Sequence, residues 1–241
     1  MVNIGDVSSM KRVAVIIPTK NEALKIEALL RHLNNIRAKD DFRILVMDSP
    51  ASEDNIQSKV LALKAEYHQS KQEGRAAQMH AGAQLCEEEI LCFLHADVLP
   101  NTHFIQEIRS CLEAEYDFGY FSYRFDKDSL MLRMNAWFTK FDGFYTGGGD
   151  QILFILNERY KESGGFNPDQ SFMEDYIFHK TLKKAGFNYK IIDKPSRVSA
   201  RKYVSNPYWK VNMLNLYVLL AFKMGRDPRV LREIYQRNLS D

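Results

Sequence analysis

The sequence has little cysteine, and this limits the kinds of site that it can hold. Its three cysteines, Cys86, Cys92 and Cys111, form no CxxC pair and cannot all be joined in disulfides. We therefore expect neither a disulfide framework nor a zinc ribbon. Such sparse cysteine is typical of a reducing compartment, and we expect the protein to be cytoplasmic.

Long hydrophobic runs are also lacking. No uncharged apolar stretch approaches the roughly 20 residues that a helix needs to span a bilayer. No apolar segment precedes Lys11-Arg12, so a secretory signal is not expected either. The formal net charge is only +2, which gives no reason to expect a nucleic-acid partner. Internal repeats and low-complexity tracts are absent from the sequence.

The first 112 residues instead show a regular alternation of strand and helix patterns. Apolar runs indicate buried parallel strands at 13–17, 42–47 and 90–94. A weaker signal indicates a further strand at 65–71. Helices with one apolar face are expected from Asn21-Glu22, from Ser52 and over 75–85. Such alternation predicts an α/β fold around a mostly parallel, doubly wound sheet.

The pattern becomes mixed after Cys111. Strands are expected at 118–125, 152–156 and 189–192, and helices at 131–141 and 173–186 and in two pieces over 208–239. No flexible linker divides these parts. We therefore predict one domain over 1–241, with a first half at about 11–112, a mixed half at about 113–205 and C-terminal helices at about 206–241.

The run 90–94 ends in His95-Ala96-Asp97, and two interpretations of these residues are open at this point. Residues two apart in an extended chain point to the same side, so His95 and Asp97 can face one metal ion or phosphate. Ligands of α/β sheets bind at such strand ends. In the alternative interpretation, Asp97 and Asn101 only cap a helix, and His95 is an ordinary strand-end residue.

Polar groups follow the other predicted strands of the first half as well. They are Thr19-Lys20-Asn21-Glu22, Asp48-Ser49 and Arg75. Because the ends of parallel strands converge on one crevice, we expect these side chains to lie near residues 95–97. Acids, one arginine and a histidine suit a ribose, a diphosphate and a divalent metal, Mn²⁺ or Mg²⁺. Taken singly, each is an ordinary turn or cap residue.

Six short motifs, in this order, resemble those of the GT-A glycosyltransferases of family 2. They are VAVIIPTKNE, LVMDS, GRAAQMHAG, FLHADV, GGF and MED. The resemblance runs from Val13 to about Leu220 and is closest to a small bacterial group, the radical-SAM/selenodomain-associated transferases. It implies a GT-A fold, a three-layer α/β/α domain. It further implies an inverting, metal-dependent hexosyl transfer from a nucleotide-diphospho-sugar to an unidentified acceptor, which is a lipid, a saccharide or a small molecule.

The resemblance also implies roles for individual residues of the first half. The nucleoside would be held by Pro18, Thr19, Glu22 and Asp48, and the diphosphate by Arg75. His95-Ala96-Asp97 matches the family's Asp-x-Asp motif, so Asp97 and His95 would bind the metal ion, with Ala96 against the donor. A metal there would neutralise the diphosphate leaving group.

For the second half, the resemblance implies a base in the acidic pair Glu174-Asp175. A carboxylate must remove the proton of the acceptor hydroxyl, and we favour Asp175, with Glu174 as its neighbour or substitute. Without the family, both acids are explained by the favourable dipole at a helix N-terminus. Donor or acceptor contacts are further implied for Gly149, Asp150 and Arg201, although a simple turn and a solvated basic loop explain these residues equally well.

Two departures from the family's pattern keep an alternative function open. His95 stands where the family usually has Asp, and Asp48-Ser-Pro lacks the usual glycine-rich turn. The alternative is a nucleotide-sugar-binding protein with degenerate catalysis. A nucleotidylyltransferase is disfavoured, because those enzymes carry a glycine-rich basic loop where this chain has Pro18-Thr-Lys-Asn-Glu.

The apolar stretch from Met213 to Phe222 is flanked by Lys210, Lys223 and Arg226. It is too short to span a bilayer. Three interpretations fit it: peripheral contact with a membrane surface, a homodimer interface through the C-terminal helices, and a helix packed on its own domain.

Overall fold

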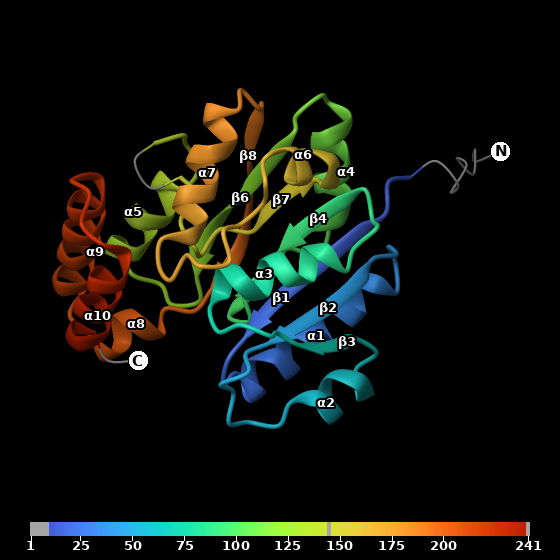
Figure 1. The fold of residues 1–241 in the computed structure, drawn as a ribbon, viewed down its shortest axis with the longest axis horizontal. Helices are drawn as coiled ribbons and strands as arrows, with labels where there is room; N and C mark the ends of the chain where they lie inside the picture. Colours follow the sequence, from blue (N-terminus) through green and yellow to red (C-terminus); the bar gives the residue numbers. More distant parts are fainter. Residues whose placement is uncertain (1–9, 144–145, 240–241) are drawn as a thin grey trace.

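The structure is a computed structural model, and it describes residues 10–143 and 146–239. Its centre is one eight-stranded sheet in the order β3-β2-β1-β4-β7-β6-β8-β5, with helices on both faces (Figure 1). This confirms the predicted α/β class with a mostly parallel central sheet.

The first half supplies four parallel strands: β1 (Val13–Thr19), β2 (Arg43–Asp48), β3 (Glu66–Gln69) and β4 (Ile90–Phe93). They are connected by α1 (Ala23–Arg37), α2 (Gln57–Ala62) and α3 (Arg75–Gln84). Every residue of β1 is buried, as expected of a central strand that is covered on both faces. The carboxyl ends of these strands meet at one edge of the sheet.

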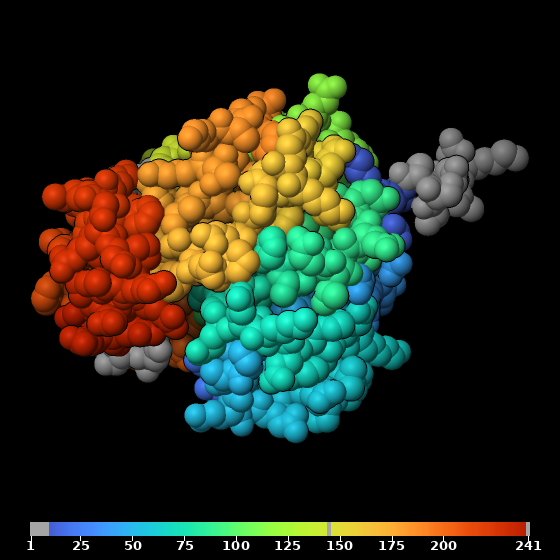
Figure 2. All heavy atoms as spheres, in the orientation of Figure 1, coloured from blue at the N-terminus to red at the C-terminus, as the bar shows by residue number. Residues whose placement is uncertain are grey.

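The rest of the sheet consists of β6 (Phe118–Phe125), β7 (Leu153–Leu156), β8 (Tyr189–Val198) and the short β5 (Val98–Leu99). Strand β7 lies antiparallel between β4 and β6, whereas β6 and β8 are parallel. The helices are α4 (Phe104–Glu113), α5 (Leu130–Phe138), α6 (Asn157–Glu162), α7 (Glu174–Lys184), α8 (Arg201–Ser205), α9 (Tyr208–Lys223) and α10 (Pro228–Asn238). The last two form one end of the molecule, coloured red in Figure 2.

The core is divided by the sheet into two layers. One face packs against α1, α2 and α4, and the other against α3, α6 and α7. Helix α3 lies very close to the sheet, since a Cβ on Gly82 would be 2.6 Å from Ile16 Cγ2 and 2.9 Å from Met47 Cγ. Glycine at this position lets α3 approach β1 and β2, which fixes Arg75 at the start of the helix.

The helices and strands differ from the sequence prediction in several places. The second helix begins at Gln57 rather than Ser52, because Ser52 donates to Asp48 and Asp54 accepts from the Ala23 N–H. Strand β8 continues to residue 198 because it pairs with β6 and β5 there. The residues after Leu156 turn into the short helix α6, which sequence patterns did not indicate.

Within the described residues, no helix is long and apolar enough to cross a membrane. Helices α9 and α10 pack on each other through Val218, Ala221 and Leu231. Phe172 and Met173, which precede α7, pack against the same cluster. The C-terminal helices therefore support the segment that leads into the acidic pair 174–175.

Candidate active site

The Asp48 carboxylate, at the end of β2, is held entirely by protein groups. Its Oδ1 accepts from Thr19 Oγ1 at 3.0 Å, the Ser49 N–H at 3.0 Å and Ser52 Oγ at 2.7 Å. Its Oδ2 accepts from the Tyr67 hydroxyl at 3.2 Å. Asp48 is only 2% exposed. Of the residues predicted to hold a nucleoside, Thr19 and Asp48 are thus hydrogen-bonded to each other.

The neighbouring loop residues complete this side of the site. Pro18 is buried in β1, while Glu22 precedes α1 and pairs with Lys25 at 2.6 Å. Gln78, which the sequence did not single out, donates from Nε2 to the carbonyls of Thr19 and Met47, both at 2.7 Å. This amide ties α3 to the ends of β1 and β2, so the loops that follow those strands keep their spacing.

Arg75 connects this side to the second half of the chain. Its Nη1 lies 3.4 Å from Oε1 of Glu174, at the start of α7. Burial lowers the pKa of Arg75, but Glu174, Asp175, Asp97 and Asp150 raise it, and the net change is a rise. Four carboxylates, two at the start of α7 and two in loops, therefore act on one guanidinium, whose side chain remains 49% exposed.

Asp175 is the most perturbed of these carboxylates. The pKa of Asp175 is strongly raised. Burial is the largest cause of the rise, followed by the charges of Glu174 and Asp150. Arg75 and the backbone N–H of Asp175 lower the pKa, but by less. Asp175 is 8% exposed. No side chain of the described residues donates a hydrogen bond to it. The acidic pair follows Met173, whose φ of 62° is uncommon for a residue other than glycine.

His95 lies directly beside this carboxylate. Its Nε2 is 4.0 Å from Asp175 Oδ2, too far for a hydrogen bond. Burial, and then the charge of Arg75, holds the pKa of His95 well below its usual value, so the ring is neutral. A neutral imidazole can bind a metal ion. Asp97, in the turn between β4 and β5, is partly exposed and offers a carboxylate on the same side of the site.

No group of three or more His, Cys, Asp and Glu side chains in residues 10–143 and 146–239 is arranged to hold a metal ion by itself. His95 and Asp97 therefore provide at most a partial ligand set. Such a set fits Mg²⁺ or Mn²⁺ in an enzyme whose substrate phosphates supply other ligands.

The loop that contains Gly149 and Asp150 covers the acidic pair. A Cβ on Gly149 would be 3.0 Å from Asp175 Oδ2 and 3.1 Å from Arg75 Nη1. The pKa of Asp150 is raised, first by loss of solvent and then by the charge of Asp97. Lys202 and Arg75 lower this pKa, but by less. Of the two basic residues at the start of α8, Lys202 thus influences Asp150, while Arg201 is exposed.

Two residues behind Asp175 were not identified from the sequence. The hydroxyl of Tyr120 lies 3.2 Å from His179 Nδ1. Burial raises the pKa of Tyr120 well above its usual value, and Asp175 adds to this rise. A signal was available, since His179 lies one helical turn after Asp175 and Tyr120 is in the aromatic strand 118–125.

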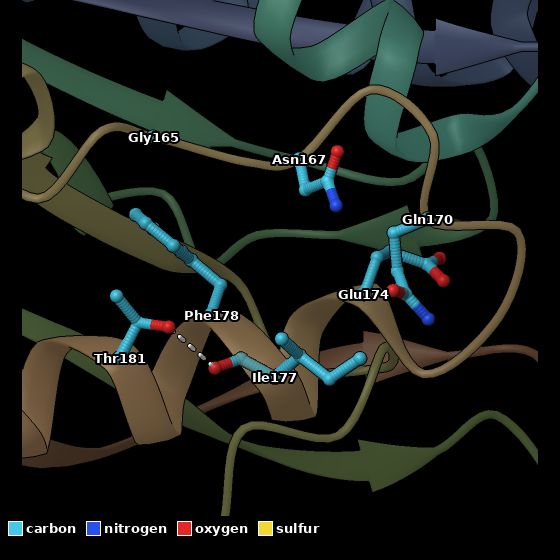
Figure 3. Close-up of a pocket in the computed structure, with 7 residues that line it drawn as sticks. All are labelled: Gly165, Asn167, Gln170, Glu174, Ile177, Phe178 and Thr181. Atoms are coloured by element: carbon cyan, nitrogen blue, oxygen red, sulfur yellow. Dashed lines mark hydrogen bonds between the residues drawn. The ribbon is translucent and has the colours of Figure 1, made fainter. Parts of the chain in front are cut away.

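A small cavity of about 50 Å³ opens beside Glu174 (Figure 3). Its other walls come from the turn before α7 and from one face of that helix: Gly165, Asn167, Gln170, Ile177, Phe178 and Thr181. Amide groups and a carboxylate thus meet an apolar wall next to the acidic pair. The volume is too small for a sugar but sufficient for ordered water.

Comparison with known proteins identifies the family of this chain. A family model described as glycosyl transferase family 2 matches residues 14–182. Comparison with curated proteins finds no significant match. Many solved structures share the fold. At the sequence identities given below, these structures show similarity of fold alone.

Three of these structures illustrate the range. A Pyrobaculum calidifontis mannosyltransferase in complex with GDP-Man and Mn²⁺ has a TM-score of 0.69 and 17% identity, over 94% of this chain and 69% of that one. Mycobacterium tuberculosis glucosyl-3-phosphoglycerate synthase, with Mn²⁺, UDP and glucosyl-3-phosphoglycerate, gives 0.63 and 14%, over 91% and 82%. Residues 1–349 of S. aureus TarS give 0.60 and 15%, over 94% and 69%. Because the family model matches well over half of the chain, this protein belongs to glycosyl transferase family 2.

Proposed function

We propose that the protein is a metal-dependent, inverting glycosyltransferase that uses Asp175 as its general base. The donor would be a nucleotide-diphospho-sugar, and the acceptor a hydroxyl group. Family membership supports glycosyl transfer from a nucleotide-sugar. The proposal depends most on one observation: a buried carboxylate with a raised pKa lies beside a guanidinium and a neutral histidine, where parallel strands end. The closer resemblance to the small bacterial radical-SAM/selenodomain-associated group is part of this proposal.

Arg75 is suited to bind the diphosphate. Its guanidinium is half exposed and can hold two phosphate oxygens at once. In the donor-free protein it pairs with Glu174, which keeps it oriented toward the site. Donor binding would add phosphate oxygens to this pair, and the negative charge already around Arg75 ensures that it stays protonated.

The residues present fit a divalent metal as part of a ternary site. The neutral ring of His95 and the carboxylate of Asp97 would hold Mn²⁺ or Mg²⁺, and oxygens of the diphosphate would complete the ligand set. The metal would offset the charge that develops on the leaving diphosphate. Structures of similar fold contain GDP-Man with Mn²⁺, and UDP with Mn²⁺ or Mg²⁺, which supports this assignment.

Asp175 is suited to accept the proton of the acceptor. In its ionised form, this carboxylate has more affinity for a proton than an ordinary surface acid has, because its pKa is raised. As the acceptor oxygen bonds to the anomeric carbon, its proton moves to Asp175. The bond from that carbon to the donor phosphate breaks, and the nucleoside diphosphate leaves with the electron pair. One displacement of this kind inverts the anomeric configuration.

Donor screening tests the proposal as a whole. We expect the melting temperature to rise with at least one of UDP-, GDP- or dTDP-sugars, and to rise further with Mn²⁺. Mn²⁺-dependent hydrolysis of that donor should be abolished in Asp97→Ala and retained in Asp128→Ala, a matched change of an exposed acid. Stabilisation without turnover across many acceptors would favour the binding-protein alternative. No stabilisation by any donor would contradict the proposal.

A further inference from the structure

Helix α5 carries an unusual stripe of exposed hydrophobic side chains. Along α5 and the turn that follows it, one face presents Leu130, Met131, Met134, Trp137, Phe138 and Phe141, each more than half exposed. The ring centroids of Trp137 and Phe141 are 4.7 Å apart, and those of Trp137 and Phe138 are 5.2 Å apart. An aromatic cluster therefore stands in solvent rather than in the core.

Helix α9 carries a second stripe of the same kind. Its exposed hydrophobic residues recur at intervals of three or four positions, from Trp209 through Met213, Tyr217 and Leu220 to Met224. The chain has only two tryptophans, and both are in these stripes, 53% and 68% exposed. Exposed hydrophobic residues gathered in this way are typical of an interaction site.

The two stripes lie on the same side of the molecule. Helices α5 and α9 are joined by hydrogen bonds from Asn135 to Asn212 at 3.1 Å, and from Tyr208 to Asn135 and the Met131 carbonyl at 2.7 and 3.3 Å. The contacts advance in the same direction on both helices, so they run parallel there. Successive residues are rotated by about 100° around a helix axis. By this measure, the exposed stripe of α5 is rotated away from the α5–α9 contact in one direction, and the stripe of α9 is rotated away from it in the other. Because the two helices are parallel neighbours, both stripes then lie on one surface, here called the α5–α9 face.

The charge around this face identifies its partner. Segments 130–141 and 208–226 contain no Asp or Glu, although acids and bases are nearly balanced in the whole chain. Their charged residues are all cations: Arg133, Lys140, Lys210, Lys223 and Arg226. Arg133 pairs with Asp128, and Lys140 pairs with Asp193, both at 3.1 Å. A symmetric dimer through this face would oppose cations with cations.

We infer that the α5–α9 face binds an anionic lipid surface. Both helices would lie in the interface with their aromatic and methionine side chains among the lipid headgroups and upper acyl chains, as amphipathic helices do. Tryptophan is suited to that depth because its ring is apolar and its N–H is polar. The cations at the rim would attract anionic headgroups, each contributing modestly. This inference does not depend on the proposed reaction.

Vesicle binding tests the inference directly on the full chain. The protein would be mixed with vesicles of phosphatidylcholine, with and without phosphatidylglycerol, and followed by co-sedimentation and tryptophan emission. Because both tryptophans are on the face, we expect a blue shift with anionic vesicles, and weaker binding as salt is raised. If the protein neither sediments with anionic vesicles nor shows a blue shift in their presence, the inference is overturned.

Variants then locate the contact. Trp209→Ser combined with Met213→Ser, and separately Lys210→Glu, should each weaken binding to anionic vesicles about tenfold. Leu24→Ser, which changes a side chain 83% exposed on α1, is the matched control and should bind normally. Equal loss in the control would contradict the assignment. A second outcome would also contradict the assignment: the wild-type protein is a dimer, the α9 variant is a monomer, and neither binds vesicles. In that case a second copy of the chain would cover the face. The wild-type salt dependence tests the inference even if a variant fails to fold.

Discussion

Two buried carboxylates at the same edge of the sheet, Asp48 and Asp175, have opposite surroundings. Asp48 accepts four hydrogen bonds from protein donors, three on Oδ1 and one on Oδ2. Asp175 receives none from any side chain of the described residues and lies next to Glu174. Burial and that neighbour raise its pKa strongly. Both residues are aspartates, and both are buried, with 2% and 8% exposure.

The difference separates a structural acid from a reactive one. Four protein donors occupy the Asp48 carboxylate, so this residue fixes the loops after β1 and β2. A desolvated carboxylate beside another acid keeps its affinity for protons, and such groups are common at catalytic sites. The side of the site where we propose that the donor binds is therefore held together by protein hydrogen bonds, and the charge that we propose to react is concentrated at α7.

Removing the reactive acid should give the largest effect. Asp175→Asn keeps the shape of the side chain but cannot accept a proton, so transfer should fall about 10²–10⁴-fold while donor binding is retained. Steady-state turnover and donor titration would separate these two effects. An unchanged rate would remove Asp175 from the role of base.

The structural acid should respond differently to the same substitution. Asp48→Asn replaces one oxygen by an NH₂ group that faces protein donors, so unfolding should become easier by about 1–3 kcal/mol. In a chain of this size that corresponds to a melting temperature lower by roughly 2–4 °C per kcal/mol. A thermal melt of Asp48→Asn that matches wild type would refute the structural role.

Crowding the reactive acid should have a smaller effect on catalysis. In Gly149→Ala the new methyl would meet Asp175 and Arg75 at about 3 Å, and we expect turnover to fall about tenfold with little change in melting temperature. Gly143→Ala is the matched control, because nothing lies within 4 Å of a Cβ there. Equal turnover in the two variants would mean that the loop does not press on the site.

The smallest effect concerns stability and pH in the metal-free protein. A raised pKa in the folded state means that the contribution of Asp175 to stability is present below about pH 4 and is lost as pH rises through the raised value. Asn cannot ionise, so the melting temperature of Asp175→Asn should exceed that of wild type increasingly from about pH 5 to pH 8. The gain at the upper end should be at least about 1 kcal/mol, since one pKa unit corresponds to about 1.4 kcal/mol. A difference that is constant with pH would argue against the raised pKa.

Much of the fold followed from local patterns in the sequence. The buried apolar runs and the helical spacing after them predicted β1, β2, β4 and their helices, and the break at 225–228 separated α9 from α10. The antiparallel position of β7 was not predictable. It depends on pairing with β4 and β6, which are distant in sequence.

The site followed from the sequence only in outline. Strand-end reasoning and the resemblance selected Arg75, Asp97 and Asp175, which the structure brings together, while their catalytic roles remain predictions. Gln78 and the Tyr120–His179 pair were missed because their partners are 31 to 59 residues away along the chain. The choice between Arg201 and Lys202 depends on the orientation of a five-residue helix, for which the sequence has no periodic signal.

The anomeric configuration of the released sugar tests the central claim most directly, namely that Asp175 activates the attacking hydroxyl in a single displacement. Hydrolysis of an α-linked nucleotide-sugar, with water in place of the acceptor, would be followed by NMR before the anomers interconvert. We predict that the β-anomer appears first and that Asp175→Asn releases it at under about a hundredth of the wild-type rate. Release of the α-anomer first, or an undiminished rate in the variant, would contradict this account.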